Sequence, residues 1–254
     1  RRLALTATAP DGDALLRVNE LMGPIVCELR VADLAGLWLA DFENVVLGLR
    51  LTPDEQKRYD YLSSTFRAVF KRFRAFNPSG TWRDFTVFAS QSEPGRSALA
   101  AFRASRQITS YCEAKRHALA TLLKEHHGQR VLVFTSDNAA AYAIAREHLI
   151  MPMTCDIDRK EREQALAAFR SGELRALVSA QVLNEGIDVP DAEVAIVVGG
   201  VRGAREHVQR VGRLLRPVPG KRACVYELVI EGTHEAHKSA VRRSALNQVG
   251  ARSA

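Results

Sequence analysis

The chain has 254 residues, of which 46% are hydrophobic, enough for one large core or for one medium core with a smaller appendage. No stretch approaches the roughly 18 apolar residues of a membrane span and no signal peptide opens the chain, so we expect a cytoplasmic protein without a membrane partner. The net charge of +7 is carried mainly by arginine and favours a polyanionic partner, although an evenly solvated basic surface would give the same number. The four cysteines form no CxxC pair and are expected to be buried free thiols: Cys27, Cys112, Cys155 and Cys224.

The first element predicted in chain order is a β-strand that ends in the small hydroxylated residues Thr6 and Thr8. The chain opens inside this strand without an initiator methionine, which indicates a piece of a longer protein. A further apolar strand is predicted at residues 45–51. Thr52 and Pro53 then predict a helix start, because threonine caps helices and proline is tolerated in the first turn.

Residues 52–106 show no strand signal and predict a small helical insertion. Four aromatic residues recur in it at helical spacing, a pattern more typical of a core than of a base-stacking platform: Tyr59, Phe66, Phe70 and Phe73. No acidic residue lies between Phe66 and Phe76, and we expect the basic side chains there to contact the backbone of a nucleic acid, as a polyanion, or a partner protein: Arg67, Lys71, Arg72 and Arg74. The run Asn77-Pro78-Ser79-Gly80 predicts the end of this helix, and residues 107–127 predict one helix that returns to a sheet.

From residue 131 onward, short apolar runs alternate with amphipathic stretches, which predicts an α/β domain with an open parallel sheet flanked by helices. The predicted strands are residues 131–135, 151–155, 176–180, 194–198 and 223–230. A helix at residues 158–171 should bury Ala165, Leu166 and Phe169 and end at Gly172. Near the end, His234 and His237 beside Glu231 and Glu235 indicate a solvated helix end rather than a metal site.

The run from Gln209 to Pro217 places Arg213 and Arg216 three residues apart, on one face of a helix. Two guanidinium groups there can meet one phosphate and neutralise charge that develops on it during phosphoryl transfer. A basic surface helix is the plain alternative, but the glycine at 212 inside the run indicates that another group approaches closely.

An earlier run, residues 178–190, passes from a strand into a polar loop that contains Gly186 and Asp188. Loops at the carboxyl ends of parallel strands are where α/β proteins bind ligands. By itself this run could equally be an ordinary strand-to-helix turn.

Taken in order, the runs around Thr6, Gly186 and Arg213 resemble motifs III, V and VI of superfamily 2 helicases, and residues 131–138 resemble motif IV. Within that superfamily the chain is similar to prokaryotic XPB through residues 33–36, 51–55, 159–172 and 185–190 and through 204–206 into motif VI. The resemblance implies a RecA-like fold in four parts. Residues 1–30 are the end of a first RecA-like motor domain, 31–51 a connector with an extra strand, 52–106 a helical thumb insertion, and 107–254 the second RecA-like domain.

The resemblance also implies roles for single residues. Arg213 and Arg216 correspond to arginine fingers, and Gln209 to a glutamine that senses nucleotide. Gly186 and Asp188 correspond to a motif V pair at the nucleotide, and Thr6 and Thr8 to hydroxyls that couple the two motor domains. Two positions depart from the pattern: Ala180 replaces a threonine, which leaves Ser179 or backbone N–H groups to contact phosphate, and Cys155 replaces a histidine.

The resemblance implies an ATP-dependent 3′-to-5′ DNA helicase in repair, with forked DNA and a companion nuclease as partners, near the nucleoid. The sequence has no GxxxxGK followed by Ser or Thr and no acidic box for magnesium, so ATP and magnesium should be held mainly by a missing first motor domain. This chain alone should therefore be inactive. The rivals are another superfamily 2 motor, such as a restriction-type translocase or an RNA helicase, and a stand-alone nucleic-acid or partner-docking module.

Overall fold

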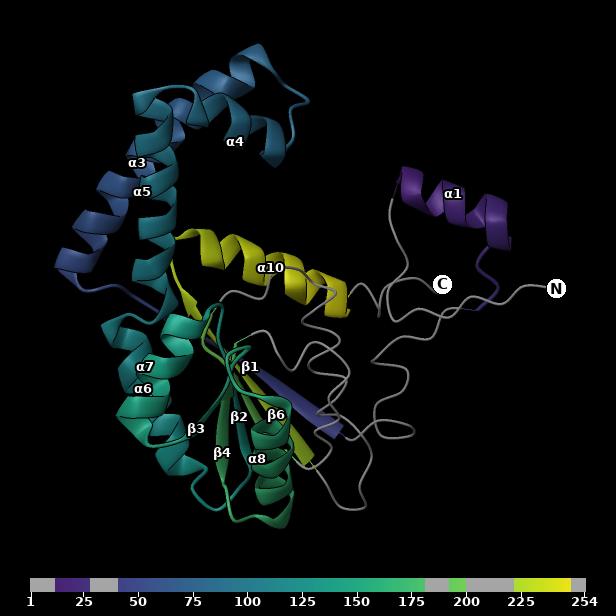
Figure 1. Ribbon diagram of the computed structural model, residues 1–254, viewed down its shortest axis with the longest axis vertical. Coiled ribbons are helices and arrows are strands. Elements are labelled where there is room, and N and C mark those ends of the chain that lie inside the picture. The colour runs from purple at the N-terminus through teal and green to yellow at the C-terminus, as the bar shows by residue number, and fades with distance from the viewer. Residues whose placement is uncertain (1–11, 28–40, 181–191, 200–221, 248–254) are drawn as a thin grey trace.

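The computed structural model describes residues 12–27, 41–180, 192–199 and 222–247. These form a sheet with helices on both faces, a helical arm that rises from one end of the sheet, and a separate short helix, α1 (Asp13–Met22) (Figure 1). No residue of α1 is buried. Among the described residues, no helix is both long enough and apolar enough to cross a lipid bilayer.

The sheet has six strands in the order β1-β6-β5-β2-β4-β3, and every neighbouring pair is parallel. Their bounds are β1 (Asp41–Leu49), β2 (Val131–Phe134), β3 (Met151–Met153), β4 (Ala176–Ser179), β5 (Val194–Val197) and β6 (Arg222–Ile230). All five strands predicted beyond residue 130 are present, and the predicted upstream strand is the edge strand β1. That strand begins earlier than expected because its full length pairs with β6, from Asp41 opposite Arg222 to Leu49 opposite Ile230.

Alternate residues of the central strands enter two separate cores. On one face, Leu132 and Phe134 of β2 pack with residues of α8 (Arg159–Ser171). On the other, Val131 and Val133 pack with residues of α6 (Glu113–Glu125) and α7 (Asn138–His148). Strands covered on both faces read as continuous apolar runs, which is why the sequence revealed them.

Helix α8 follows its sequence signals closely. The Asp158 side chain accepts a hydrogen bond from the backbone N–H of Glu161, which caps the first turn. Gly172 ends the helix at a φ of 81°, a conformation that other residues adopt only with strain. The three residues predicted to face the core, Ala165, Leu166 and Phe169, are all buried.

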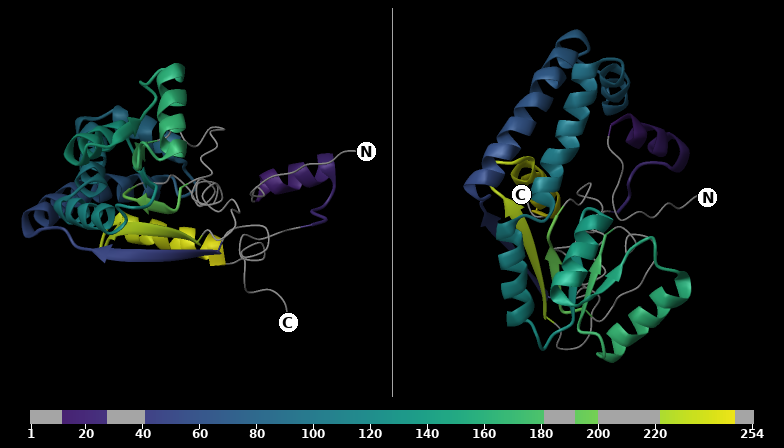
Figure 2. Two further views of the ribbon diagram at one scale, coloured as in Figure 1. Left: turned by 90° about the horizontal axis from the view of Figure 1, so that it is seen from below. Right: turned by 60° about the vertical axis from the view of Figure 1, so that its left-hand side comes forward.

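The arm consists of α3 (Pro53–Phe76), α4 (Trp82–Ser90) and α5 (Glu93–Ser110). Thr52 and Glu55 form a reciprocal capping box at the start of α3, and Pro53 occupies its first turn, as predicted. In Figure 1 and in the right view of Figure 2, α3 and α5 run side by side away from the sheet and α4 lies at the far end. Since α3 follows β1 directly, the arm is rooted at the carboxyl edge of the sheet.

The end of the arm is held together by aromatic rings. Phe85 is fully buried, and its ring centroid lies 5.0 Å from that of Phe70 and 5.4 Å from that of Phe73. Phe66 lies 4.8 Å from Phe102 of α5. The prediction that Phe66, Phe70 and Phe73 form a core is therefore confirmed, whereas Tyr59 packs near the sheet with Leu51 and Ile230.

Two expectations about elements and cysteines were wrong. Residues 107–127 form not one helix but two, because the chain is extended at Cys112 while Tyr111 turns its hydroxyl toward Glu147 and His148 of α7, at 3.0 and 3.1 Å. Helix α5 thus runs through residue 106 and ends at Ser110. Of the cysteines, Cys112 is buried and Cys224 half-buried, but Cys27 and Cys155 are exposed, because both lie outside the helices and strands.

Candidate nucleic-acid interface

The carboxyl edge of the sheet carries polar residues directly after three strands. Thr135, Ser136 and Asp137 follow β2, Thr154 follows β3, and Ser179 ends β4. The backbone N–H of Thr135 donates to the carbonyl of Ser179 at 2.9 Å, which fixes the first loop against β4. Ligands of open parallel sheets bind at this edge.

Asp137 organises the loop after β2. One carboxylate oxygen caps α7 by accepting from the backbone N–H of Ala140 at 2.9 Å, and the other accepts from the hydroxyls of Ser136 at 2.7 Å and Ser110 at 2.8 Å. Burial would raise the pKa of Asp137, but these hydrogen bonds, with one from the backbone of Ala139, outweigh it and hold the pKa below its ordinary value. The part of the predicted motif IV that follows β2 is therefore a loop that carries a negative charge and is fixed by hydrogen bonds.

A second polar group lies between α7 and the end of β3. The Tyr142 hydroxyl lies 2.7 Å from that of Thr154 and donates to Asp156 at 3.0 Å. The side-chain amide of Asn138 donates to the sulfur of Cys155 at 3.1 Å. Cys155, which stands where the sequence resemblance led us to expect histidine, is exposed at this edge.

Among the site residues predicted for the sheet domain, Ser179 is the one that lies in a described range. Its side chain is 0% exposed, and its hydroxyl has no hydrogen-bond partner within those ranges. A contact between this hydroxyl and DNA would require the side chain to be uncovered. Seven further predicted site residues lie outside the described residues: Thr6, Thr8, Gly186, Asp188, Gln209, Arg213 and Arg216.

The four basic residues of the arm differ in their surroundings. All four are exposed, and none forms an ion pair within the described part of the chain. Because an α-helix turns 100° per residue, Arg67, Lys71 and Arg74 line one stripe of α3, whereas Arg72 lies about 100° away from Lys71. Arg74 donates to the carbonyls of Pro78 and Gly80 and so also fixes the end of α3, while the Nε of Arg67 donates to the carbonyl of Ser63 at 3.2 Å.

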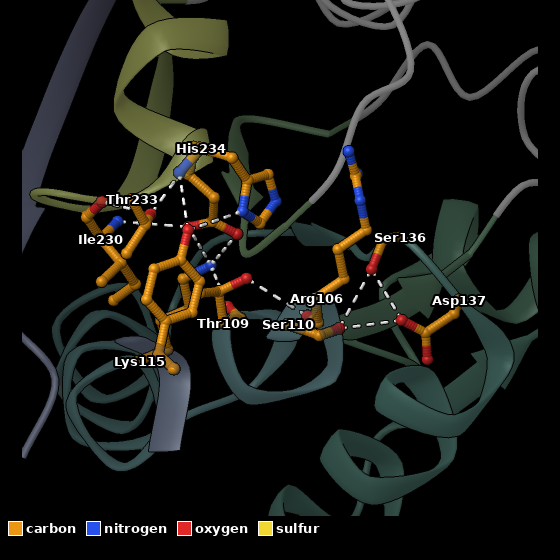
Figure 3. Close-up of polar contacts among 11 residues, drawn as sticks. Arg106, Thr109, Ser110, Lys115, Ser136, Asp137, Ile230, Thr233 and His234 are labelled. Atoms are coloured by element: carbon orange, nitrogen blue, oxygen red, sulfur yellow. Dashed lines mark hydrogen bonds and ion pairs between the residues drawn. The ribbon is translucent and has the colours of Figure 1, made fainter. Parts of the chain in front are cut away.

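The root of the arm contains a buried ion pair that the sequence patterns did not reveal. Lys115 of α6 is 0% exposed, and its ammonium donates to both carboxylate oxygens of Glu235, at 2.9 and 2.8 Å, and to the carbonyl of Thr109 at 2.7 Å (Figure 3). Glu235 belongs to α10 (His234–Asn247), so the pair joins elements 120 residues apart. The expectation of a solvated helix end here was wrong for Glu235, because the charge of Lys115 compensates its burial.

His234 is half-buried beside this pair. Its Nδ1 lies 3.4 Å from the hydroxyl of Tyr59, which accepts a hydrogen bond from the backbone N–H of His234 at 3.1 Å. Burial, together with the charges of Arg106, Lys238 and Lys115, which act in the same direction, lowers the pKa of His234 to about 3. His234 is therefore neutral near pH 7 and joins α3 to α10 through hydrogen bonding.

Metal binding finds no support in the ranges that the structure describes. No group of three or more His, Cys, Asp or Glu side chains there could hold an ion. The described residues therefore do not fit a magnesium site.

Comparison with known proteins defines the class first. Residues 114–218 match the helicase conserved C-terminal domain. In fold, the chain is similar to the Hef helicase domain of Pyrococcus furiosus, with a TM-score of 0.60 at 15% identity over 94% of this chain and 66% of the other. It is also similar to the C-terminal part of the Fun30 ATPase domain, with a TM-score of 0.57 at 11% identity over 80% of this chain and 90% of the other. The fold is the RecA-like α/β architecture of helicase motor domains, as predicted.

The sequence places the chain more narrowly. It is 36% identical, over 95% of its length, to the DNA 3′-5′ translocase XPB2 of Sulfurisphaera tokodaii. It is 29% identical, over 81% of its length, to the putative DNA 3′-5′ helicase Rad25 of Halobacterium salinarum. The chain spans 55% and 36% of the lengths of these two relatives. This chain is an XPB-like sequence of helicase superfamily 2, and the predicted resemblance is confirmed.

Proposed function

We propose that the chain forms the second motor domain and the thumb of an ATP-dependent DNA translocase of the XPB type, which moves 3′ to 5′ on forked DNA and acts in DNA repair near the prokaryotic nucleoid. One observation carries the proposal. The 36% identity to a DNA translocase extends over 95% of the chain, so it includes the helical arm as well as the helicase domain at residues 114–218. The proposal assigns residues 1–30 to the end of a first motor domain, 31–51 to a connector, 52–106 to the thumb, and 107–254 to the second motor domain.

The chain contributes arginines to a nucleotide site that it shares with a first motor domain. In the proposal Arg213 and Arg216 neutralise charge on the transferring phosphate, and Gln209, Gly186 and Asp188 line the same cleft. ATP and magnesium are held mainly by the first motor domain, because this chain has no GxxxxGK sequence to cradle the phosphates. Thr6 and Thr8 couple the two motor domains.

DNA lies, in the proposal, along the carboxyl edge of the sheet and against the basic stripe of the arm. The edge offers Ser136 and Asn138 at the start of α7 and the backbone beside Ser179, and the arm offers Arg67, Lys71, Arg72 and Arg74. Arginine and lysine that contact phosphates bind without regard to sequence, as a translocase requires. The arm can also dock a companion nuclease, in which case its charges would not affect binding of DNA.

The decisive experiment compares this chain alone with the same chain joined to an XPB-type first motor domain. ATP hydrolysis with and without single-stranded DNA, and displacement of streptavidin from biotinylated 3′ or 5′ ends, are measured for both. We expect no turnover by the chain alone and DNA-stimulated, 3′-to-5′ movement by the joined protein. DNA-stimulated turnover by the isolated chain, or 5′-to-3′ movement by the joined protein, would refute the proposal.

The same experiment separates the alternative functions. An RNA helicase would unwind paired RNA in preference to paired DNA, and a restriction-type translocase would move on duplex DNA without separating its strands. A stand-alone binding module would bind nucleic acid or protein with no turnover when joined to any motor domain.

A further inference from the structure

Two cations at the root of the arm, Arg106 and Lys238, form no ion pair with any residue that the structure describes. Arg106 of α5 lies between His234 and the cluster formed by Ser110, Ser136 and Asp137 (Figure 3). Its guanidinium makes no hydrogen bond within the described ranges, and its Nε is buried there without a partner. Lys238 of α10 is half-buried, and this burial, with the nearby positive charge of Arg106, lowers its pKa. It forms no ion pair with any described residue.

The nearby carboxylate cannot neutralise them. Both oxygens of Glu235 are engaged by the ammonium of Lys115, and one also accepts from the backbone N–H of Ile230 at 3.2 Å. Among the described residues, Glu235 thus faces three positive charges, those of Lys115, Arg106 and Lys238. Burial lowers the pKa of Arg106 and of Lys238, and in Lys238 the charge of Arg106 adds to the effect.

The surroundings hold Arg106 in place rather than neutralise it. Its guanidinium carbon lies 4.4 Å from the ring centroid of Phe102, which orients the plane of the group. An arginine remains charged even when partly desolvated, and a desolvated, uncompensated charge destabilises the folded protein. Such an arrangement is typical of a site that gains its counter-ion on binding.

The missing counter-ion has a recognisable chemistry. A planar guanidinium with free N–H donors matches two oxygens of a phosphate, and a neighbouring ammonium adds charge without geometric demand. The loop after β5 lies close to the same groups: a Cβ added at Gly199 would lie 3.4 Å from the carbonyl oxygen of Ser110, 3.6 Å from the hydroxyl of Ser136 and 3.9 Å from the ammonium of Lys115.

We propose that Arg106 and Lys238 bind a phosphate group at the root of the arm. Resting on the proposed function, this group is a backbone phosphate of the DNA strand that runs from the carboxyl edge of the sheet to the arm. The site would then link the position of the arm to the presence of DNA, because Arg106 belongs to α5 and Lys238 to α10.

The test compares Arg106→Gln with Arg103→Gln, which removes the same charge from an exposed position one turn away on α5. Binding of fluorescein-labelled oligo(dT) by the full chain is measured across a salt series, and the melting temperature is measured without DNA. For Arg106→Gln we expect about tenfold weaker binding at low salt and a slope of log K against log salt reduced by about 0.7, one phosphate contact on a single strand. The melting temperature should hold or rise, since an uncompensated charge is removed. Lys238→Gln should weaken binding in the same direction, and Arg103→Gln should do so far less.

Two outcomes would overturn the inference. One is equal DNA binding by the Arg106 and Arg103 variants. The other is a lower melting temperature for Arg106→Gln with an unchanged salt slope, which would make Arg106 a structural residue.

A second arm identifies the source of the phosphate. Inorganic phosphate at constant ionic strength should raise the melting temperature of the wild-type chain and not that of Arg106→Gln. This result together with unchanged DNA affinity would overturn the assignment to DNA and leave a site for free phosphate. Absence of any DNA binding by the wild-type chain, with this protection intact, would refute the proposed function while supporting the anion site.

Discussion

The effect of the basic stripe of α3 on DNA binding can be separated from the effect of overall charge by comparing two variants. The variant Arg67→Gln/Lys71→Gln removes two charges from the stripe, and the control Lys57→Gln/Arg58→Gln removes two exposed charges from the same helix. At 1.5 Å and 100° per residue, Lys57 and Arg58 lie about 15 and 14 Å from Arg67 along the axis and about 80° and 180° around it, so the control lies off the stripe. Net charge falls equally in both proteins.

The expected magnitude follows from helix geometry. Residues four apart are separated by about 6 Å along the helix axis. Phosphates of one DNA strand recur about every 3.4 Å along the duplex axis, so the two side chains can each contact one phosphate of the same strand. Loss of two contacts to duplex DNA should reduce the slope of log K against log salt by about 1.8. If the plots of log K against log salt for the wild type and the variant meet near 1 M salt, the affinity of the variant at 0.1 M salt is roughly 60-fold lower than that of the wild type.

The assay is fluorescence anisotropy of forked DNA titrated with each protein from about 0.05 to 0.3 M salt, a range over which phosphate contacts dominate. The control should keep a slope close to that of the wild type. Equal changes in both variants would mean that only overall charge matters and would refute a contact at the stripe. No change in either would remove DNA from the arm and leave a companion protein as its partner.

Three further predictions concern the stability of the arm and its root. Phe85→Ala should lower the free energy of unfolding by about 3 to 5 kcal/mol in urea titrations, because the fully buried ring contacts three aromatic residues of α3, namely Phe66, Phe70 and Phe73; a loss below about 1 kcal/mol would contradict its place in the core. Lys115→Met should cost about 3 to 5 kcal/mol by leaving Glu235 buried without its counter-ion, and Lys115→Met/Glu235→Leu should cost less; equal losses would show that the pair is not coupled. The lowered pKa of His234, about 3 in the folded chain, means that the unfolded chain binds more protons between about pH 6.5 and 3. Stability should thus fall with decreasing pH in that window, by about 1 kcal/mol per unit, and His234→Gln should flatten the dependence.

Local signals were sufficient for the sheet domain. Strands covered on both faces must be apolar throughout, so β2, β4 and β5 were recognisable as short runs. The start of α3 was equally clear, because Thr52 and Glu55 satisfy backbone groups within a few residues of each other in the sequence. The place of Phe66, Phe70 and Phe73 in the aromatic core of the arm followed from helical spacing, whereas that of Phe85 and Phe102 did not.

Contacts between distant segments were not recognisable in this way. Nothing near Lys115 or Glu235 in the sequence indicates that the two charges are buried against each other, since 120 residues separate them. The break between α5 and α6 depends on Tyr111 reaching Glu147 and His148, again through tertiary contacts. Arg106 is a further example, because only the fold shows that its buried Nε has no hydrogen-bond partner among the described residues.

The central claim, that this chain supplies the arginines of a two-domain DNA motor, is tested most directly by DNA-stimulated ATP turnover. The measurement uses the chain joined to an XPB-type first motor domain and the same protein with Arg213→Ala or Arg216→Ala. Arginine fingers act mainly on charge in the transition state, so each variant should lower kcat by about 10³-fold or more while the affinity for ATP changes much less. Near-normal turnover by either variant would contradict the role proposed for that arginine, and near-normal turnover by both would contradict the account.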